Sequence, residues 1–412
     1  MASRSAKGGG VGSSSADRVI SFGPGLARIP ERLLLAHARG QVLFLVGAGV
    51  SRASGHPDFR GLVESVYKTQ DLSIYSFIEK TRNVKNVESV KSALTKATLA
   101  DGQKAEVLRF LAGDFDVALG MLERRIDGAE LLTSKVREAV ATELRNGDKK
   151  PAAIHRSLMR LSDRGMTSTI ITTNFEYLLE RAGKGRHGKP TTYSLGGIPR
   201  PSLRDDFSGV LHIHGALDAD ASRTGDLIFS DRDFGEFYLR RRVVPDFIYD
   251  AARLFYIVLV GYSANDPPMR YLLNAVAADG RRFSDLKERF TFVPVDKPDP
   301  ILMEDWKGRG ITPIEYDSAN DHTALEKTLT RWAAFSANSG RQATVNAAVK
   351  RAVAQSRATA DDATRDLFDH LIRRSDPAER TRIAGFASKH GADLDWLDAI
   401  ISISTEKERV TT

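Results

Sequence analysis

Residues Val42–Leu62 read VLFLVGAGVSRASGHPDFRGL and say more about the architecture than any other stretch of the chain. Five apolar residues run directly into a turn with two glycines, Gly47-Ala48-Gly49. A short apolar run that ends in glycine is typical of a buried parallel strand. Glycines at such a strand end let backbone N–H groups approach a phosphate without an intervening side chain. The stretch therefore predicts a nucleotide-binding loop after a strand.

Three later segments also lie at the ends of predicted strands: Ile170–Glu176 (IITTNFE), Leu211–Gly215 (LHIHG) and Val258–Pro267 (VLVGYSANDP). Together with the Gly-Ala-Gly turn and the following Pro-Asp-Phe-Arg, they resemble, in the same order, the motifs of sirtuins, the Sir2 family of NAD-consuming enzymes. The absence of cysteine removes the four-thiolate zinc site of protein-deacylating sirtuins. The chain is therefore most similar to the bacterial Sir2-like branch without zinc.

The resemblance implies that NAD binds along the carboxyl ends of the strands. It implies catalytic roles for Asn174, which would orient the ribose or the attacking water, and for His214, the general base. Glu176 stands where the family usually has aspartate, which leaves its contact with nicotinamide open. The implied NAD-binding residues are Gly47, Ala48, Gly49 and Ser51 at the pyrophosphate, Asp58, Phe59 and Arg60 at the nicotinamide ribose, Thr173 and Glu176 beside them, and Gly261, Ser263 and Asp266 on the adenosine side.

Composition limits the remaining classes of protein. The chain has 412 residues, 42% of them hydrophobic, and contains no apolar run long enough to span a bilayer. The N-terminus lacks the apolar core of a secretory signal, so we expect a cytoplasmic protein without a membrane partner. Lysine and arginine are scattered rather than clustered, so the net charge of +7 does not predict direct nucleic-acid binding. The proposed chemistry requires no metal.

The alternation of apolar runs with helical patterns predicts an α/β fold. We expect a Rossmann-like parallel sheet with helices on both faces. The predicted organisation is a disordered tail over 1–28, a Sir2-like NAD-binding domain over 29–334 with a helical insertion at about 62–150, and a helical C-terminal region over 335–412. The predicted strands after the first are 168–172, 210–214, 254–260, 290–295 and 311–316.

The leading functional hypothesis is an NAD hydrolase that releases nicotinamide and ADP-ribose. The resemblance implies an NAD-depleting effector of bacterial anti-phage defence. It would be controlled by assembly as a homo-oligomer or by a HerA-like hexameric ATPase, with an Argonaute-associated form as a weaker alternative. A protein deacylase or ADP-ribosyltransferase remains a second hypothesis, although the zinc cysteines are missing. A non-catalytic NAD-binding scaffold is a third, and the presence of both Asn174 and His214 argues against it.

Overall fold

The computed structural model describes residues 18–84, 86–128, 134–145, 149–163, 168–183, 188–201, 207–217, 227–262, 273, 276, 286–336 and 340–411. The chain divides into two compact units. The central unit runs from Gly40 to Arg341, and the terminal unit combines the residues up to Arg39 with those from Gln342 onward. The candidate site lies in the central unit.

A seven-stranded parallel sheet forms the centre of the central unit, in the order β5-β6-β4-β3-β7-β8-β9. The strands are β3 (Val42–Val46), β4 (Thr169–Thr172), β5 (Thr191–Tyr193), β6 (Gly209–His212), β7 (Tyr256–Val260), β8 (Arg289–Val295) and β9 (Ile311–Asp317). β3 is buried at all five positions. A strand that is covered on both faces has no polar side to alternate with, which explains its uniformly apolar sequence.

Helices cover both faces of this sheet. Leu43 and Leu45 of β3 join a core with α12 (Val243–Leu254) and α14 (Pro300–Gly308). Phe44 packs on the opposite face against Trp332 of α15 (Ala319–Ser336), with ring centroids 5.6 Å apart. On that face α9 (Ala153–Leu161) packs against both α15 and α10 (Leu178–Gly183). The predicted Rossmann-like α/β fold with two helical layers is confirmed.

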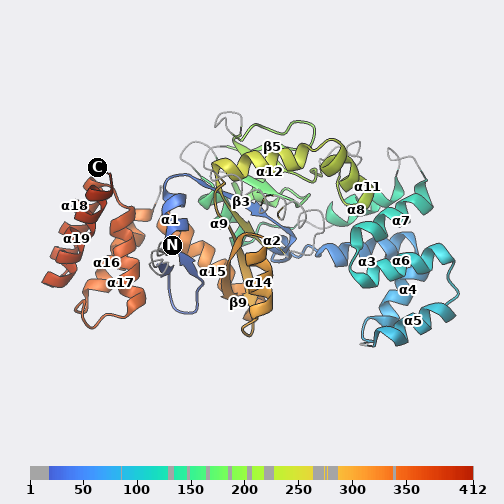
Figure 1. Ribbon diagram of the computed structural model, residues 1–412, viewed down its shortest axis with the longest axis horizontal. Coiled ribbons are helices and arrows are strands. Elements are labelled where there is room, and N and C mark those ends of the chain that lie inside the picture. Colours follow the sequence, from blue (N-terminus) through green and yellow to red (C-terminus); the bar gives the residue numbers. More distant parts are fainter. Residues whose placement is uncertain are drawn as a thin grey trace, which may run out of the picture. The chain divides into compact units, whose positions relative to one another are not determined.

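A helical module follows the first strand and the short α2 (Ala48–Arg52). It consists of α3 (Phe59–Gln70), α4 (Leu72–Thr81), α5 (Val87–Lys96), α6 (Asp101–Ala112), α7 (Phe115–Asp127) and α8 (Lys135–Arg145), which form a bundle of their own (Figure 1). Gly113, whose left-handed backbone (φ +83°) ends α6, separates α6 from α7. The core of this module also takes in Phe175 and Phe229, which come from loops that follow strands of the sheet.

The terminal unit brings the two ends of the described chain together. β1 (Val19–Ser21) pairs antiparallel with β2 (Arg28–Pro30), and α1 (Glu31–Ala38) follows directly. The other helices are α16 (Arg341–Val353), α17 (Asp362–Arg374), α18 (Pro377–Lys389) and α19 (Leu394–Thr411). Glu31 of α1 accepts hydrogen bonds from Arg373 (2.7 Å) and contacts His370 (3.1 Å) on α17.

These contacts correct the predicted boundaries. The tail was expected to extend to residue 28, but Val19–Ser21 is already a strand of a hairpin. The helix before β3 was assigned to the NAD-binding domain, yet it belongs to the same unit as the C-terminal helices. The buried ion pair between Glu31 and Arg373 explains the difference, because its partners are far apart in sequence. Asp376 caps α18 by accepting from the Glu379 amide, and Pro377 is the first residue of this helix.

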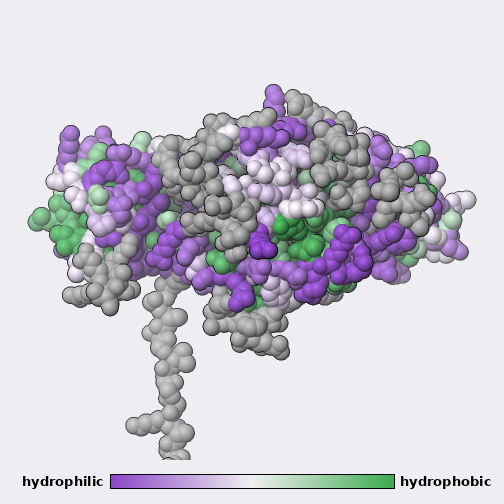
Figure 2. Space-filling view, turned by 90° about the horizontal axis from the view of Figure 1, so that it is seen from above, coloured by the Kyte–Doolittle hydropathy of each residue, from purple (hydrophilic) through white to green (hydrophobic). Residues whose placement is uncertain are grey.

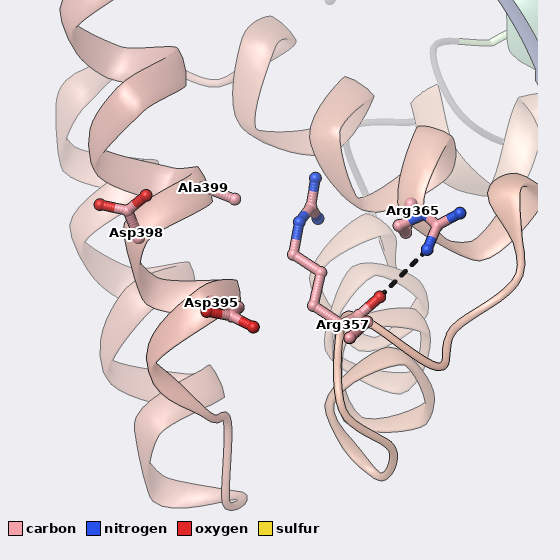
Figure 3. A pocket seen from close by; sticks show the side chains of 6 residues that line it. Arg357, Arg365, Asp395, Asp398 and Ala399 are labelled. Carbon is pink, nitrogen blue, oxygen red and sulfur yellow. Dashed lines mark hydrogen bonds between the residues drawn. The ribbon is translucent and has the colours of Figure 1, made fainter.

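Polar residues are prominent on the face of the molecule seen in Figure 2. Hydrophilic residues (purple) cover most of the face seen in Figure 2, and apolar residues (green) gather in separate areas. The apolar residues of α19 are only partly buried: Trp396 and Ile400 are inside, whereas Ile401 is 64% exposed. A pocket of about 450 Å³ lies beside α19, lined by Arg357 and Arg365 on one side and Asp395 and Asp398 on the other (Figure 3).

None of the described helices combines the length and apolar character needed to cross a bilayer.

Candidate functional site

The site is built at the point where the chain reverses its direction across the sheet. β3 lies between β4 and β7, and the chain leaves β3 toward β4 but later returns to β7 on its other side. In open parallel sheets the loops diverge at such a point and leave a crevice beyond the carboxyl ends of the strands. The predicted motifs after β3, β4 and β6 therefore lie at the carboxyl ends of three neighbouring strands.

Glycines allow the loop after β3 to touch the end of β7. The Gly47 N–H donates to the Val260 carbonyl (2.9 Å), and the Gly49 N–H donates to the Gly261 carbonyl (2.9 Å). A Cβ atom on Gly49 would lie 2.8 Å from that carbonyl oxygen, and Gly261 itself has a left-handed backbone (φ +68°). These positions require glycine for close backbone packing. The N–H groups of Gly47 and Gly49 were expected to bind a pyrophosphate, but in this structure they donate to backbone carbonyls of the protein.

Three side chains at the ends of β3 and β4 form a polar network, which we define as Ser51, Asn174 and Glu176. The Asn174 amide nitrogen donates to Ser51 Oγ (2.8 Å) and lies 3.2 Å from Glu176 Oε1. The Ser51 hydroxyl in turn donates to Glu176 Oε1 (2.5 Å). Burial raises the pKa of the Glu176 carboxyl, although its hydrogen bond from Ser51 opposes the shift. The network fixes the orientation of the Asn174 amide.

His212, the last residue of β6, contacts the backbone of Asn174 in this network and the side chain of Glu180. Its Nδ1 lies 2.6 Å from the Asn174 carbonyl oxygen, and its Nε2 lies 2.9 Å from Glu180 Oε1. Burial disfavours the charged imidazolium, but the hydrogen bond and charge of Glu180 outweigh it and raise the pKa of His212. A protonated imidazole donates from both nitrogens, which matches these two acceptors. His212 therefore has a structural role.

His214 lies two residues farther along, in a very different environment. Its Nε2 is 2.7 Å from the Tyr238 hydroxyl, and its ring meets Phe234 and Tyr238 edge-on, with centroids 5.5 and 5.9 Å away. We call Phe234 and Tyr238 the aromatic cage. The cage brings no charge close to the imidazole, and burial alone lowers the pKa of His214 to about 3. His214 is thus neutral at physiological pH.

The segment that carries the cage is anchored by a buried arginine of the helical module. Phe234 ends α11 (Asp231–Phe234), and Tyr238 lies on the π-helix η2 (Gly235–Arg240). The guanidinium of the fully buried Arg137 pairs with Asp233 (2.6 Å) of α11 and with Glu123 (2.8 Å) of α7. Asp233 also accepts from two backbone amides at the start of α11.

Asp58, Phe59 and Arg60 lie at the start of α3. Asp58 caps the helix by accepting from the Gly61 amide (2.8 Å), and Phe59 packs edge-on against Phe115 of α7. Arg60 pairs with Glu64 (3.1 Å) on the surface. The contact of Phe59 with Phe115 ties the segment to the rest of the helical module.

The remaining predicted residues divide into two groups. Ala48 begins α2, and the Thr173 amide donates to the Val46 carbonyl (3.0 Å), so both lie beside the polar network. Ser263 and Asp266 lie outside the described residues.

Among the described side chains, no group of three or more His, Asp or Glu residues could hold a metal ion.

Sequence analysis missed Glu180 and Tyr238. Glu180 lies in a short helix between Leu179 and Arg181, and this local pattern does not indicate a buried histidine partner on another strand. Tyr238 follows His214 by 24 residues in a segment rich in aromatics, and its π-helical backbone has no known sequence signature. The aromatic run Phe234–Tyr238 was the only available signal.

Comparison with known proteins identifies one domain family. Residues 168–314, which extend from β4 into β9, match the family model of the SIR2-like domain. An uncharacterized protein of Sinorhizobium fredii, y4cA, is 31% identical over 371 residues, which are 85% of this chain. The chain spans 28% of the length of that relative.

Two solved structures are also similar. One, from work on the mechanism and regulation of Sir2 enzymes, aligns with 74% of this chain and 94% of its own length, at 14% identity and a TM-score of 0.31. The other, a Sir2 homologue in complex with NAD, aligns with 76% of this chain and 94% of its own length, at 15% identity and a TM-score of 0.30.

Proposed function

We propose that this protein hydrolyses NAD to nicotinamide and ADP-ribose. The observation that carries the proposal is that an oriented Asn174 amide and a neutral, buried His214 follow the ends of the neighbouring strands β4 and β6. The match of residues 168–314 to the SIR2-like domain supports an NAD-related activity.

The chemistry requires two contributions from the protein, a group that positions the reactants and a base. The bond between ribose C1′ and nicotinamide breaks, and its electron pair leaves with nicotinamide, which departs neutral. Positive charge then spreads over the ribose, and a water oxygen bonds to C1′ while one of its protons passes to a base. An oriented amide can position that water or a ribose hydroxyl, and a neutral imidazole can take the proton. We assign these roles to Asn174 and His214.

The test is NAD turnover by purified protein, with nicotinamide, ADP-ribose and acyl-ADP-ribose quantified separately. We expect Asn174→Ala and His214→Ala each to lower turnover by about 100-fold or more. Asn86→Ala and His390→Ala are matched controls, because neither residue belongs to the proposed site. Asn86 caps α5 in the helical module, and His390 contacts the Phe386 carbonyl in the terminal unit. Nicotinamide release that survives in both site variants would contradict the assignment.

The same assay separates the alternatives. A protein deacylase forms product only when an acylated peptide is present, and an ADP-ribosyltransferase attaches ADP-ribose to an acceptor instead of releasing it. A scaffold subunit binds NAD without turnover. The neutral imidazole beside the aromatic cage favours a catalytic site over a scaffold.

We further propose that the enzyme depletes NAD in bacterial anti-phage defence, in the cytoplasm, and that assembly or a HerA-like hexameric ATPase controls it. The resemblance to zinc-free Sir2-like proteins supports this role. Turnover measured with and without a HerA-like ATPase, together with the mass of the complex in solution, tests it. Equal turnover in both conditions, with no complex formed, would count against this partner.

A further inference from the structure

We propose that Tyr238 is a positioning residue, whose hydroxyl oxygen accepts the Nε2–H of His214 and thereby leaves Nδ1 as the nitrogen that takes the proton. The catalytic part of this inference rests on the NAD hydrolysis proposed above. The placement of the proton on the imidazole does not depend on it and can be measured in the protein without substrate.

The contact between the two side chains is short and buried in the protein interior. Nε2 of His214 lies 2.7 Å from the Tyr238 hydroxyl, and both residues are at most 5% exposed. No other hydrogen bond to the His214 ring is found among the described residues. A hydrogen bond at one ring nitrogen selects the tautomer and thus decides which nitrogen remains a base. Tyr238 is the residue placed to make that choice.

The backbone around Tyr238 is built to hold it there. Six residues, Gly235–Arg240, form a π-helix directly after α11. Such helices are rare and occur frequently at functional sites, because the wider turn changes the direction of the side chains that follow. The Phe234 and Tyr238 rings pack against each other (5.3 Å between centroids) and both contact the imidazole. The segment can therefore hold the ring of His214 as well as its Nε2.

The anchored start of α11 fixes this segment in turn. Ser230 and Asp233 cap the helix reciprocally, and the Asp233 carboxylate is paired with the buried Arg137. The Ile228 amide also donates to the His214 carbonyl (2.8 Å), which ties the same segment to the histidine backbone. Tyr238 is thus presented to His214 by a rigid support, as a positioning role requires.

The proton balance is simple. In the resting state Nε2 carries the proton and donates it to the phenol oxygen, while Nδ1 holds a lone pair. During hydrolysis Nδ1 takes one proton from the attacking water, and the imidazolium keeps its Nε2–H bond to Tyr238. That bond strengthens when the ring becomes charged, which partly offsets the cost of a buried cation.

The experiment combines ¹⁵N NMR of histidine-labelled protein with steady-state kinetics. The His214 signals are assigned by their loss in His214→Gln. We expect the Nε2–H tautomer in the unmodified protein and a mixture of tautomers in Tyr238→Phe. In the kinetics, Tyr238→Phe should lower kcat about tenfold with KM changed less than twofold, because the lost hydrogen bond acts on the proton transfer.

Tyr316→Phe is the matched control. It removes another tyrosine–histidine contact, from Tyr316 to Nδ1 of His322 (3.0 Å), at the opposite edge of the sheet. This variant should leave both the His214 signals and kcat unchanged. A change of the same size in both variants would reveal a general loss of structure and overturn the positioning role.

The remaining outcomes are also decisive. An Nδ1–H tautomer in the unmodified protein overturns the proposal, as does a Tyr238→Phe variant with unchanged tautomer and unchanged kcat. If Tyr238→Phe fails to fold, the spectrum of the unmodified protein alone decides the tautomer. If the unmodified protein does not turn over NAD, but its His214 carries the Nε2–H tautomer and Tyr238→Phe loses it, the contact stands and the hydrolase proposal fails.

Discussion

The polar network and the aromatic cage lie at the ends of neighbouring strands, yet they control their central residues in opposite ways. Asn174 donates to Ser51 and Glu176 and, through its backbone carbonyl, accepts from His212. His214 has one hydrogen-bonded partner in the cage and two aromatic rings that meet its own ring edge-on. The first environment fixes orientation by hydrogen bonds, whereas the second holds an imidazole neutral by excluding water.

The two histidines make this difference measurable. His212 and His214 are two residues apart and both buried, but burial is opposed by Glu180 only at His212. The pKa of His212 is therefore raised and that of His214 is lowered to about 3. Position along the strand does not decide the charge of a histidine here; the presence of one buried carboxylate does.

The largest effect should come from removing the anchor of the cage. Arg137→Met leaves the carboxylates of Glu123 and Asp233 buried without their cation, and we expect the free energy of unfolding to fall by about 3–5 kcal/mol. Urea unfolding followed by circular dichroism measures this loss. Arg124→Ala is the matched control, because Arg124 also joins α7 to α11 through Asp231 but is 48% exposed. It should cost less than about 1 kcal/mol, and equal losses in both variants would refute the anchoring role.

The next effect tests the polar network directly. Asn174→Asp keeps the size of the side chain but places a carboxyl beside Glu176, where the amide nitrogen now lies 3.2 Å from an oxygen. The donor that bonds Ser51 and Glu176 is lost, so we expect NAD turnover to fall by about 100-fold. Nicotinamide release measures the change. Turnover within threefold of the unmodified protein would show that the orientation of this amide is unimportant.

The cage predicts a distinct dependence of stability on pH. Because the pKa of His214 is lowered in the folded state by burial, the unfolded chain binds its proton first as the pH falls. The contribution of His214 to stability is complete above about pH 6.5 and declines below it, at about 1.4 kcal/mol per pH unit. In His214→Gln this part of the slope should disappear between pH 6 and 4, as urea unfolding at several pH values would reveal.

His212 supplies the opposite sign for comparison. Its pKa is raised in the folded state, so its contribution is present at low pH and is lost as the pH rises through the folded value. His212→Gln should therefore leave the slope between pH 6 and 4 unchanged and alter stability above pH 6.5. Identical pH profiles for the two variants would erase the distinction between the environments.

Much of the central unit could be predicted because its elements are specified locally. The uniform apolar run of β3 and the glycines after it indicate a buried strand and a close turn without knowledge of any partner. The catalytic candidates Asn174 and His214 came instead from the resemblance of two short segments, each next to a strand end, to sirtuin motifs. The α/β architecture follows from the repetition of such segments.

The parts that could not be predicted depend on contacts between distant residues. The pairing of Glu31 with Arg373 joins segments more than 300 residues apart in sequence, and neither residue carries a local sign of its partner. The same holds for Tyr238, whose contact with His214 depends on a π-helical turn and on the anchor at Arg137. Even the role of Gly49 changed, because the approach of Gly261 is visible only in three dimensions.

The smallest effect concerns the charge of Glu176, the residue that departs from the family pattern. Burial raises the pKa of its carboxyl, and in the network Oε1 serves as an acceptor for Ser51 and Asn174. The amide oxygen of glutamine can accept both bonds in the same place, so Glu176→Gln should lower kcat/KM by only about threefold, within the range of one weakened hydrogen bond. Glu176→Ala is the informative partner, because it removes the acceptor and leaves the Ser51 hydroxyl and one Asn174 proton without it. We expect a loss of about tenfold or more for that variant. If glutamine is as damaging as alanine, the negative charge itself acts on the substrate, and the polar network would then work through electrostatics as well as orientation.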